Sequence, residues 1–221
     1  MPAQRGVDSG RLAVIGHSEG ALFALLLATG AAGPAPRIHA LGLFEPLPIR
    51  YLDIISIQVK AQVSAALRAG QISSSEAAKI QSSLASAIHS LRTASKLPPN
   101  LPDGLNVVLN RSDALFLAQA DRYDPAKLAA RLGRHFPVLV SCSNADIHVT
   151  CGEVDHLLAG LTKAHTNTDS VRLKGVDHVL KQDPSRTADH YGAPLPFSSQ
   201  LQNALRKFVY PRRPDLRISG V

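Results

Sequence analysis

A serine between small residues stands near the start of the chain, where it could act as a nucleophile. Residues 16–20, Gly-His-Ser-Glu-Gly, have the form G-x-S-x-G and lie between the β-prone apolar run 11–15 and the helix-prone apolar run 21–29. This order predicts a nucleophile elbow, a sharp strand-to-helix turn that exposes the serine, Ser18. We expect both glycines to be required because strand and helix approach closely there. A serine that merely caps the helix is the alternative interpretation.

A nucleophilic serine needs a base, and the base needs a carboxylate that orients it. After an elbow these partners follow in the order acid and then histidine, each in a loop beyond a later strand. Asp146 follows the apolar run 137–142, and His178 follows the run 170–174. The sequence therefore predicts a catalytic set of Ser18, Asp146 and His178. The backbone N–H of Glu19, at the start of the helix, is the expected donor to an oxyanion.

Other residues compete for these roles. Glu45 also ends an apolar run, at 38–44, and is the alternative acid; a plain loop charge at the following proline is the competing interpretation. Asp177 adjoins His178 and is interpreted as a turn residue. His17 is interpreted as packing or elbow support. Four further histidines have no matching context and are expected on the surface or in the core: His148, His156, His165 and His190.

Two cysteines and two of these histidines lie within fifteen positions. Cys142, His148, Cys151 and His156 have the spacing C-x5-H-x2-C-x4-H, which matches no standard zinc pattern, so no metal site is predicted. The two thiols could approach in an oxidising compartment. We expect two reduced, partly buried cysteines instead.

The predicted elements alternate between strand and helix, which indicates an α/β fold with a parallel sheet. Strands are expected at 11–15, 38–44, 137–142 and 170–174, and helices at 21–29, 125–133, 154–165 and 200–209. The middle of the chain is different. Helical spacing from residue 52 to Gly70, a capping box of Ser73 and Glu76 before a helix at 74–94, and a short helix at 114–120 predict a helical insertion between strands.

Four segments carry a resemblance to a known family: GHSEG at 16–20, Tyr-Asp-Pro at 123–125, PVLVSCSNADIHV at 137–149 and GVDHVLK at 175–181. Together they resemble the esterase and serine-aminopeptidase-like branch of the α/β-hydrolase superfamily. The resemblance implies that Ser18 is the nucleophile, His178 the general base and later acid, and Asp146 the orienting acid. It implies an acyl-enzyme formed from a small-molecule ester or peptide-like amide, with no cofactor.

The resemblance covers about residues 5–210 and implies a partial α/β-hydrolase fold, a parallel sheet flanked by helices with a helical lid insertion. The expected parts are the elbow unit and following strand at 1–49, the lid at 50–122, the remaining core at 123–210 and a basic tail at 211–221. The family's strands before the elbow have no counterpart, since only ten residues precede the run at 11–15. The family's upstream His-Gly or Gly-Gly oxyanion loop has no counterpart either. The loss of one oxyanion donor lowers the reaction rate by about 100- to 1000-fold.

Two hypotheses follow for function. In the first, the chain belongs to a serine hydrolase whose whole form is active. In the second, it is a non-catalytic binding module whose free sheet edge is covered by a partner or by a second copy. An acyltransferase with the same three residues is a further alternative.

Composition narrows the classes of partner. The 221 residues carry a net charge of +7, and residues 206–217 hold five basic residues and one acidic residue, so most of the excess lies at one end. No nucleic-acid-binding motif accompanies it, and nucleic acid is not an expected partner. The longest apolar run, 21–28, is too short to span a bilayer. A polar start without a signal-peptide pattern predicts a cytoplasmic protein.

Overall fold

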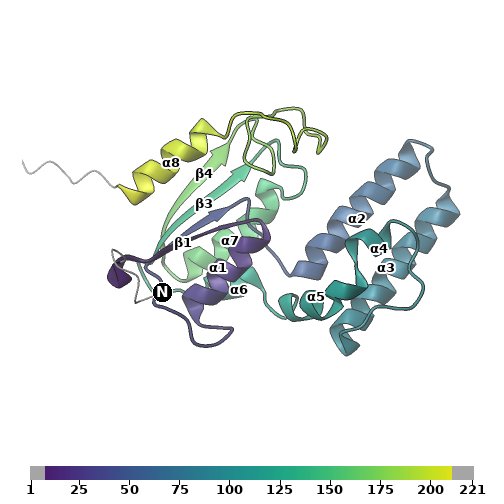
Figure 1. Ribbon diagram of the computed structural model, residues 1–221, viewed down its shortest axis with the longest axis horizontal. Coiled ribbons are helices and arrows are strands. Elements are labelled where there is room, and N and C mark those ends of the chain that lie inside the picture. The colour runs from purple at the N-terminus through teal and green to yellow at the C-terminus, as the bar shows by residue number, and fades with distance from the viewer. Residues whose placement is uncertain (1–7, 211–221) are drawn as a thin grey trace, which may run out of the picture. The chain divides into compact units, whose positions relative to one another are not determined.

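The computed structural model describes residues 8–210 (Figure 1), so the basic tail expected at 211–221 lies outside the described residues. Within this range, strands β1 (Ala13–His17), β2 (Ala40–Phe44), β3 (Pro137–Ser143) and β4 (Asn167–Leu173) form a parallel sheet in the order β1-β2-β3-β4. The register pairs the last residues of neighbouring strands: His17 with Phe44, and Ser143 with Leu173. The prediction of a parallel sheet is confirmed, and the carboxyl ends of its strands share one edge.

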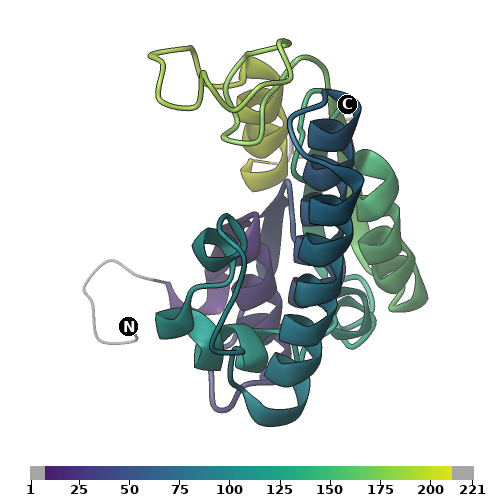
Figure 2. The same ribbon diagram turned by 90° about the vertical axis from the view of Figure 1, so that its right-hand side faces the viewer.

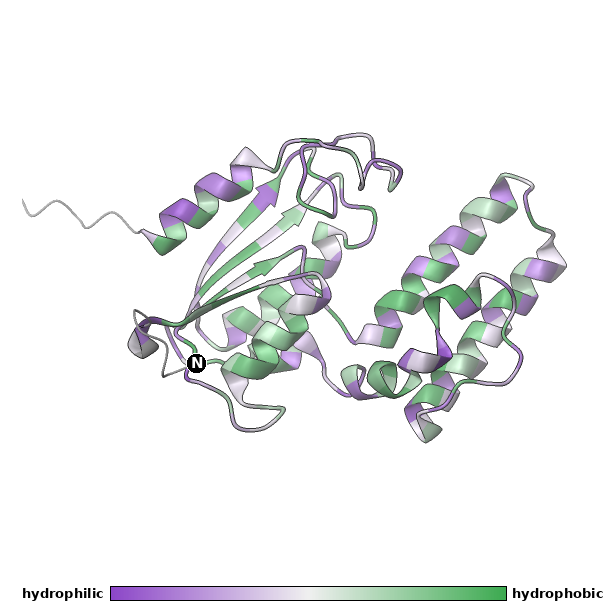
Figure 3. Ribbon diagram, in the orientation of Figure 1, coloured by the Kyte–Doolittle hydropathy of each residue, from purple (hydrophilic) through white to green (hydrophobic). Residues whose placement is uncertain are grey.

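Helices cover both faces of this sheet, which explains why β2 and β3 are apolar at nearly every position. Helix α8 (Ser199–Val209) lies on one face, and α1 (Glu19–Thr29) lies on the other, with α7 (Cys151–Lys163), as Figures 1 and 2 show. Helix α1 is apolar along most of its length (Figure 3) and packs on β1 and β2. Beneath α8, the sheet contributes buried leucines and the helix contributes Leu201 to one core.

The expected elements occur, with ends shifted by a few residues. The short helix α6 (Pro125–Ala129) begins at the predicted proline, after Asp124, whose Oδ1 accepts the N–H groups of the next turn. It ends earlier than expected. Helix α4 (Leu105–Val108) and two 3₁₀ turns, Ser9–Arg11 and Arg111–Asp113, were not predicted, since such short elements carry no periodic signal.

Residues 49–127 form a compact helical unit, separate from the α/β unit that holds the sheet. Its helices are α2 (Tyr51–Arg68), α3 (Ser74–Ala94), α4 and α5 (Ala114–Ala120). The predicted capping box is present: the Glu76 N–H donates to Ser73 Oγ, and the Ser73 N–H donates to Glu76 Oε2. Hydrophilic and hydrophobic residues are interspersed along α2 and α3 (Figure 3), and the apolar residues of these helices form a core of their own. The expected insertion at 50–122 lies within this unit.

One buried carboxylate ties the helical unit together. Asp121, whose side chain is 1% exposed, accepts the N–H of Leu52 at the start of α2 and pairs with Arg50 and with Arg92 near the end of α3. Arg92 also pairs with Asp53, whose side chain is 45% exposed. The ends of α2, α3 and α5 therefore meet at a single carboxylate.

Cys142 and Cys151 form a disulfide, with their Cα atoms 5.2 Å apart. The expectation of two reduced cysteines is therefore wrong. The loop after β3 turns back on itself, so the end of the strand meets the first residue of α7. The cytoplasmic location stays a prediction, and disulfides are uncommon in that compartment. Among residues 8–210, none of the helices combines the length and the apolarity needed to cross a membrane.

The elbow at Ser18 joins β1 to α1. Ser18 has a φ of 51° and a ψ of −120°, and its side chain makes no capping hydrogen bond to α1, so the interpretation of a mere helix cap is wrong. Its N–H donates to the Phe44 carbonyl at 2.9 Å, and its carbonyl accepts the Leu47 N–H at 3.0 Å. A Cβ at Gly16 would lie 2.2 Å from the Gly20 carbonyl oxygen, whereas a Cβ at Gly20 would meet nothing within 4 Å. The expected need for a glycine is confirmed at position 16 and wrong at position 20.

We predict that Gly16→Ala lowers the free energy of unfolding by about 3 kcal/mol, because a methyl group cannot fit against the backbone of α1. Gly20→Ala is the matched control. It should leave stability unchanged or raise it by up to about 1 kcal/mol, since alanine favours a helix over glycine. Urea denaturation of both variants gives the comparison. Equal losses in the two variants would contradict the close approach at Gly16.

We also predict that Asp121→Asn destabilises the helical unit by about 3 kcal/mol, because it leaves two arginines without their shared carboxylate. The control Asp53→Asn removes an exposed partner of the same Arg92 and should cost less than about 1 kcal/mol. Denaturant unfolding followed by helical circular dichroism measures both. If Asp53→Asn lowered the free energy of unfolding as much as Asp121→Asn, burial of the carboxylate would not determine how much its removal destabilises the unit.

Candidate active site

Three polar side chains converge at the carboxyl edge of the sheet. Ser18 follows β1, Asp146 lies in the loop after β3, and His178 lies in the loop after β4. His178 Nε2 is 3.0 Å from Ser18 Oγ, and His178 Nδ1 is 2.8 Å from Asp146 Oδ2. The structure thus brings together the three residues selected from the sequence. With Nδ1–H donating to Asp146, Nε2 can accept the proton of Ser18.

The acid loop, residues 143–150, holds Asp146 from its own backbone. Asp146 Oδ1 accepts the N–H of His148 at 2.7 Å and that of Val149 at 3.1 Å. Burial alone would raise the pKa of Asp146, but its hydrogen bond and charge interaction with His178, together with these two N–H groups, hold that pKa below its ordinary value. Asp146 is therefore an anion that is 2% exposed and has defined partners.

The histidine loop, residues 175–181, is shaped by Asp177. Asp177 Oδ1 accepts the Lys181 N–H at 2.7 Å, and the backbones of these two residues pair at 2.9 Å, so the interpretation of Asp177 as a turn residue is confirmed. The turn presents the ring of His178 toward Ser18.

The acid loop and the histidine loop are joined directly. Ser143 Oγ donates to the Val176 carbonyl at 2.5 Å, and Asn144 Oδ1 accepts the Gly175 N–H at 2.8 Å. These bonds fix the two loops to each other, so the distance between Asp146 and His178 does not depend on their side chains alone.

Two more histidines flank His178. His17 Nε2 donates to the His178 carbonyl at 2.6 Å, so His17 ties the end of β1 to the histidine loop, and its role as packing or elbow support stays a prediction. His148 was expected on the surface or in the core; it is partly buried, and its ring lies 4.9 Å from that of His178, which places it beside the site. Burial lowers the pKa of both flanking histidines. The position of His148 two residues after Asp146, in the same loop, was the signal available in the sequence.

The remaining histidines lie away from these contacts. His156 and His165 are exposed, and the exposed His190 pairs with Asp183 at 3.0 Å. The two cysteines of the C-x5-H-x2-C-x4-H pattern form the disulfide and have no free thiol to bind a metal ion. Within the part of the chain that the structure describes, no group of three or more histidine, cysteine, aspartate or glutamate side chains is placed to hold a metal ion.

Glu45 lies at the end of β2 and is fully buried. Its neighbours are Ser141, whose Oγ is 3.4 Å from Glu45 Oε1, and the carboxyl group of Asp146, which is within hydrogen-bonding reach. Asp146 is the carboxylate on His178 Nδ1, so the geometry gives the orienting position to Asp146 and leaves Glu45 behind it.

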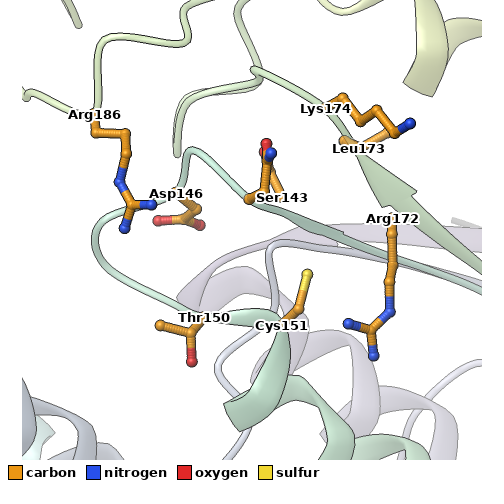
Figure 4. A pocket seen from close by; sticks show the side chains of 9 residues that line it. Ser143, Asp146, Thr150, Cys151, Arg172, Leu173, Lys174 and Arg186 are labelled. Atoms are coloured by element: carbon orange, nitrogen blue, oxygen red, sulfur yellow. The ribbon is translucent and has the colours of Figure 1, made fainter.

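A pocket of about 340 Å³ lies beside the acid loop (Figure 4). Asp146, Thr150 and Cys151 line it, together with Arg172 and Arg186. Ser18 and His178 are not among its lining residues, so it is not a pocket for the reacting group.

Glu19, the expected source of an oxyanion donor, is the first residue of α1, where backbone N–H groups and the helix dipole favour negative charge.

No protein-family model matches the chain, and the search of curated proteins finds no match. Among solved structures, an esterase from Pyrococcus furiosus is similar at 16% identity and a TM-score of 0.46, over 90% of this chain and 53% of that one. A hydrolase from Pseudomonas aeruginosa is similar at 19% identity and a TM-score of 0.43, over 90% of this chain and 64% of that one. A monoacylglycerol lipase from Paleococcus ferrophilus is similar at 20% identity and a TM-score of 0.38, over 80% of this chain and 63% of that one. The chain thus spans less than two thirds of each of these proteins.

The fold itself is recognisable from this chain's own geometry. A parallel sheet has helices on both faces, and a strained G-x-S-x-G turn joins a strand to a helix. An aspartate and then a histidine follow at the ends of later strands, in the order typical of α/β hydrolases. Residues 8–210 therefore have a partial α/β-hydrolase fold with the elbow strand β1 at its start.

Proposed function

We propose that the chain is a serine hydrolase that cleaves a carboxylic ester or a peptide-like amide through an acyl-enzyme. The observation that carries the proposal is the hydrogen-bond chain from Ser18 Oγ through the His178 ring to Asp146 Oδ2. Nucleophile, base and orienting acid have the polarity and reach that acyl transfer requires.

In the first half-reaction, Ser18 Oγ attacks the substrate carbonyl carbon while His178 Nε2 takes the hydroxyl proton. The negative charge on the carbonyl oxygen is stabilised by the Glu19 backbone N–H at the start of α1. His178 then gives its proton to the leaving alcohol or amine, and the bond to that group breaks. In the second half, His178 deprotonates a water molecule that attacks the acyl carbon, and Ser18 is released with its proton.

A fluorophosphonate probe tests the nucleophile. We predict that the wild-type chain is labelled and that Ser18→Ala is not, whereas Ser82→Ala, at an exposed serine of α3, keeps full labelling. Asp146→Asn should slow labelling by about 10³- to 10⁴-fold because the histidine loses its orienting charge, while Asp189→Asn, at an exposed aspartate, should have no effect. Labelling that survives in Ser18→Ala would refute the assignment.

We propose that the helical unit, residues 49–127, acts as a lid that selects the acyl group. The chain enters this unit directly after Pro48, next to Leu47, whose N–H holds the Ser18 carbonyl. A lid that meets an acyl chain needs apolar surface of its own. On this unit Val107 is 81% exposed and Leu115 is 60% exposed.

Replacing both residues, Val107→Ser with Leu115→Ser, should therefore raise KM for long-chain nitrophenyl esters by about tenfold and leave KM for the acetate ester unchanged. About 1.4 kcal/mol of lost apolar contact corresponds to that factor. The control Leu67→Ser changes a partly exposed leucine at the far end of α2 and should not alter chain-length preference. An equal rise in KM for all esters would contradict the lid assignment.

A non-catalytic binding module is the second candidate. The observation that favours it is the apolar surface around the elbow strand: Ile15 is exposed, as are Phe23 and Leu27 of α1, and within residues 8–210 β1 pairs with β2 alone. A folded wild-type chain that resists the probe and forms a dimer through this surface in sedimentation would favour the module. An acyltransferase would instead reveal itself by new esters or amides when alcohols or amines are added.

A further inference from the structure

Two carboxyl groups are buried side by side at the edge of the sheet. Glu45 ends β2 and is fully buried, and Asp146 follows the neighbouring β3 and is 2% exposed. Their strands pair directly, with Phe44 opposite Ser141, and the Glu45 N–H donates to the Ser141 carbonyl. The backbone therefore places Glu45 beside the end of β3, and the following loop brings the Asp146 carboxyl group within hydrogen-bonding reach of the Glu45 carboxyl group. Two like charges this close, without solvent, are strongly unfavourable.

One oxygen of Glu45 has no donor. Oε1 accepts from Ser141 Oγ, and the Ser143 backbone N–H is also within hydrogen-bonding reach of the carboxyl group and favours its charged form. Oε2, however, is buried and makes no hydrogen bond as an acceptor within the described residues. An orphaned buried oxygen of this kind is costly. The carboxyl group within reach is that of Asp146, which is an acceptor when ionised. A proton on Glu45 would turn the orphaned oxygen into a donor and give it a partner.

The surroundings decide which of the two groups holds the proton. Asp146 accepts hydrogen bonds from two backbone N–H groups and from His178, and all of them stabilise its charged form. Glu45 faces Asp146 and, beyond it, His178, whose ring is flanked by His17 and His148. Burial and the charge of Asp146 raise the pKa of Glu45 to about 9. The negative charge therefore belongs on Asp146.

We propose that Glu45 is a positioning residue for the proposed hydrolysis: it stays protonated in the folded protein and donates its Oε2–H to the Asp146 carboxylate. The pair then carries one negative charge, which faces His178. Glu45 acts on the reaction through Asp146 and not by direct contact with the substrate, and it is not a substitute acid. This inference rests on the proposed function for its kinetic consequences, but the proton itself has a separate test.

The kinetic test compares three residues at position 45. Glu45→Gln keeps a neutral side chain with an N–H donor, so its labelling rate at pH 7 should stay within about threefold of the wild type. Glu45→Leu removes the donor and should be slower by about tenfold. The wild-type rate should fall above about pH 9, as Glu45 ionises beside Asp146, and this fall should be absent in Glu45→Gln. A loss of 10³-fold or more in Glu45→Gln would overturn the proposal, because it would mean that Glu45 acts as a carboxylate.

The stability test needs no activity. From the ordinary pKa of 4.5 up to about 9, folded Glu45 would hold a proton that the unfolded chain releases. The unfolding equilibrium constant of the wild type should therefore rise, relative to that of Glu45→Gln, by up to tenfold per pH unit across this window. The control is Glu76→Gln, at an exposed carboxylate whose pKa hydrogen bonds from Ser73 lower. The ratio of the unfolding equilibrium constant of the wild type to that of Glu76→Gln should not rise with pH.

These two readouts separate the two claims. An unlabelled wild-type chain whose stability still follows the predicted pH dependence would refute the proposed hydrolase and leave the shared proton supported. A flat ratio between wild type and Glu45→Gln from pH 5 to pH 9 would overturn the shared proton whatever the activity. An infrared band of a protonated carboxyl group at pH 7, lost in Glu45→Gln, would support it, and its absence would count against it.

Discussion

Ser18 has a strained backbone conformation, with a φ of 51° and a ψ of −120°, which a serine rarely adopts. A conformation of this kind costs about 1–3 kcal/mol and persists where the surroundings over-determine it. Here the surroundings are the end of β2, which binds the Ser18 N–H through Phe44 and the Ser18 carbonyl through Leu47, and the contact of Gly16 with the backbone of Gly20. The hydroxyl therefore leaves the strand at a fixed point, and every other part of the site is placed relative to it.

The remaining parts reach that point because the sheet is parallel and its strands are neighbours in chain order. Each strand ends at the same edge, so the loops after β2, β3 and β4 are adjacent, although the helical unit, residues 49–127, lies between β2 and β3 in the chain. The loop after β3 brings Asp146, and the loop after β4 brings His178. Ser143 Oγ donates to the histidine loop, and Asn144 Oδ1 accepts from it. These two hydrogen bonds fix the distance between the carboxylate and the ring.

The longer elements and the three central residues could be predicted from the sequence because both leave local signals, whereas α4 and the two 3₁₀ turns could not. Apolar runs, a capping box and a glycine after a helix depend on neighbours in the chain, and the order of Ser18, Asp146 and His178 follows from strand ends. Contacts between distant loops leave weaker signals, such as the position of His148 two residues after Asp146. The disulfide, the approach of His148 to the His178 ring, and the burial of Glu45 beside Asp146 depend on how the loop after β3 folds back. That a side chain is tolerated at position 20 depends on the direction of the Cβ atom there, which the sequence does not reveal.

The acid loop also explains why one of two adjacent carboxyl groups carries the charge. A buried anion needs donors, and Asp146 has two backbone N–H groups of the loop after β3 and the His178 ring. The Glu45 side chain at the end of β2 has Ser141 Oγ and the Ser143 backbone, and its other oxygen has no donor. The same loop is closed covalently at both ends. Cys142 ends the buried strand, Cys151 begins α7, and the disulfide between them limits the conformations open to the residues that they enclose. The carboxylate that orients His178, and that faces Glu45, thus lies in a short loop whose two ends are joined by a disulfide.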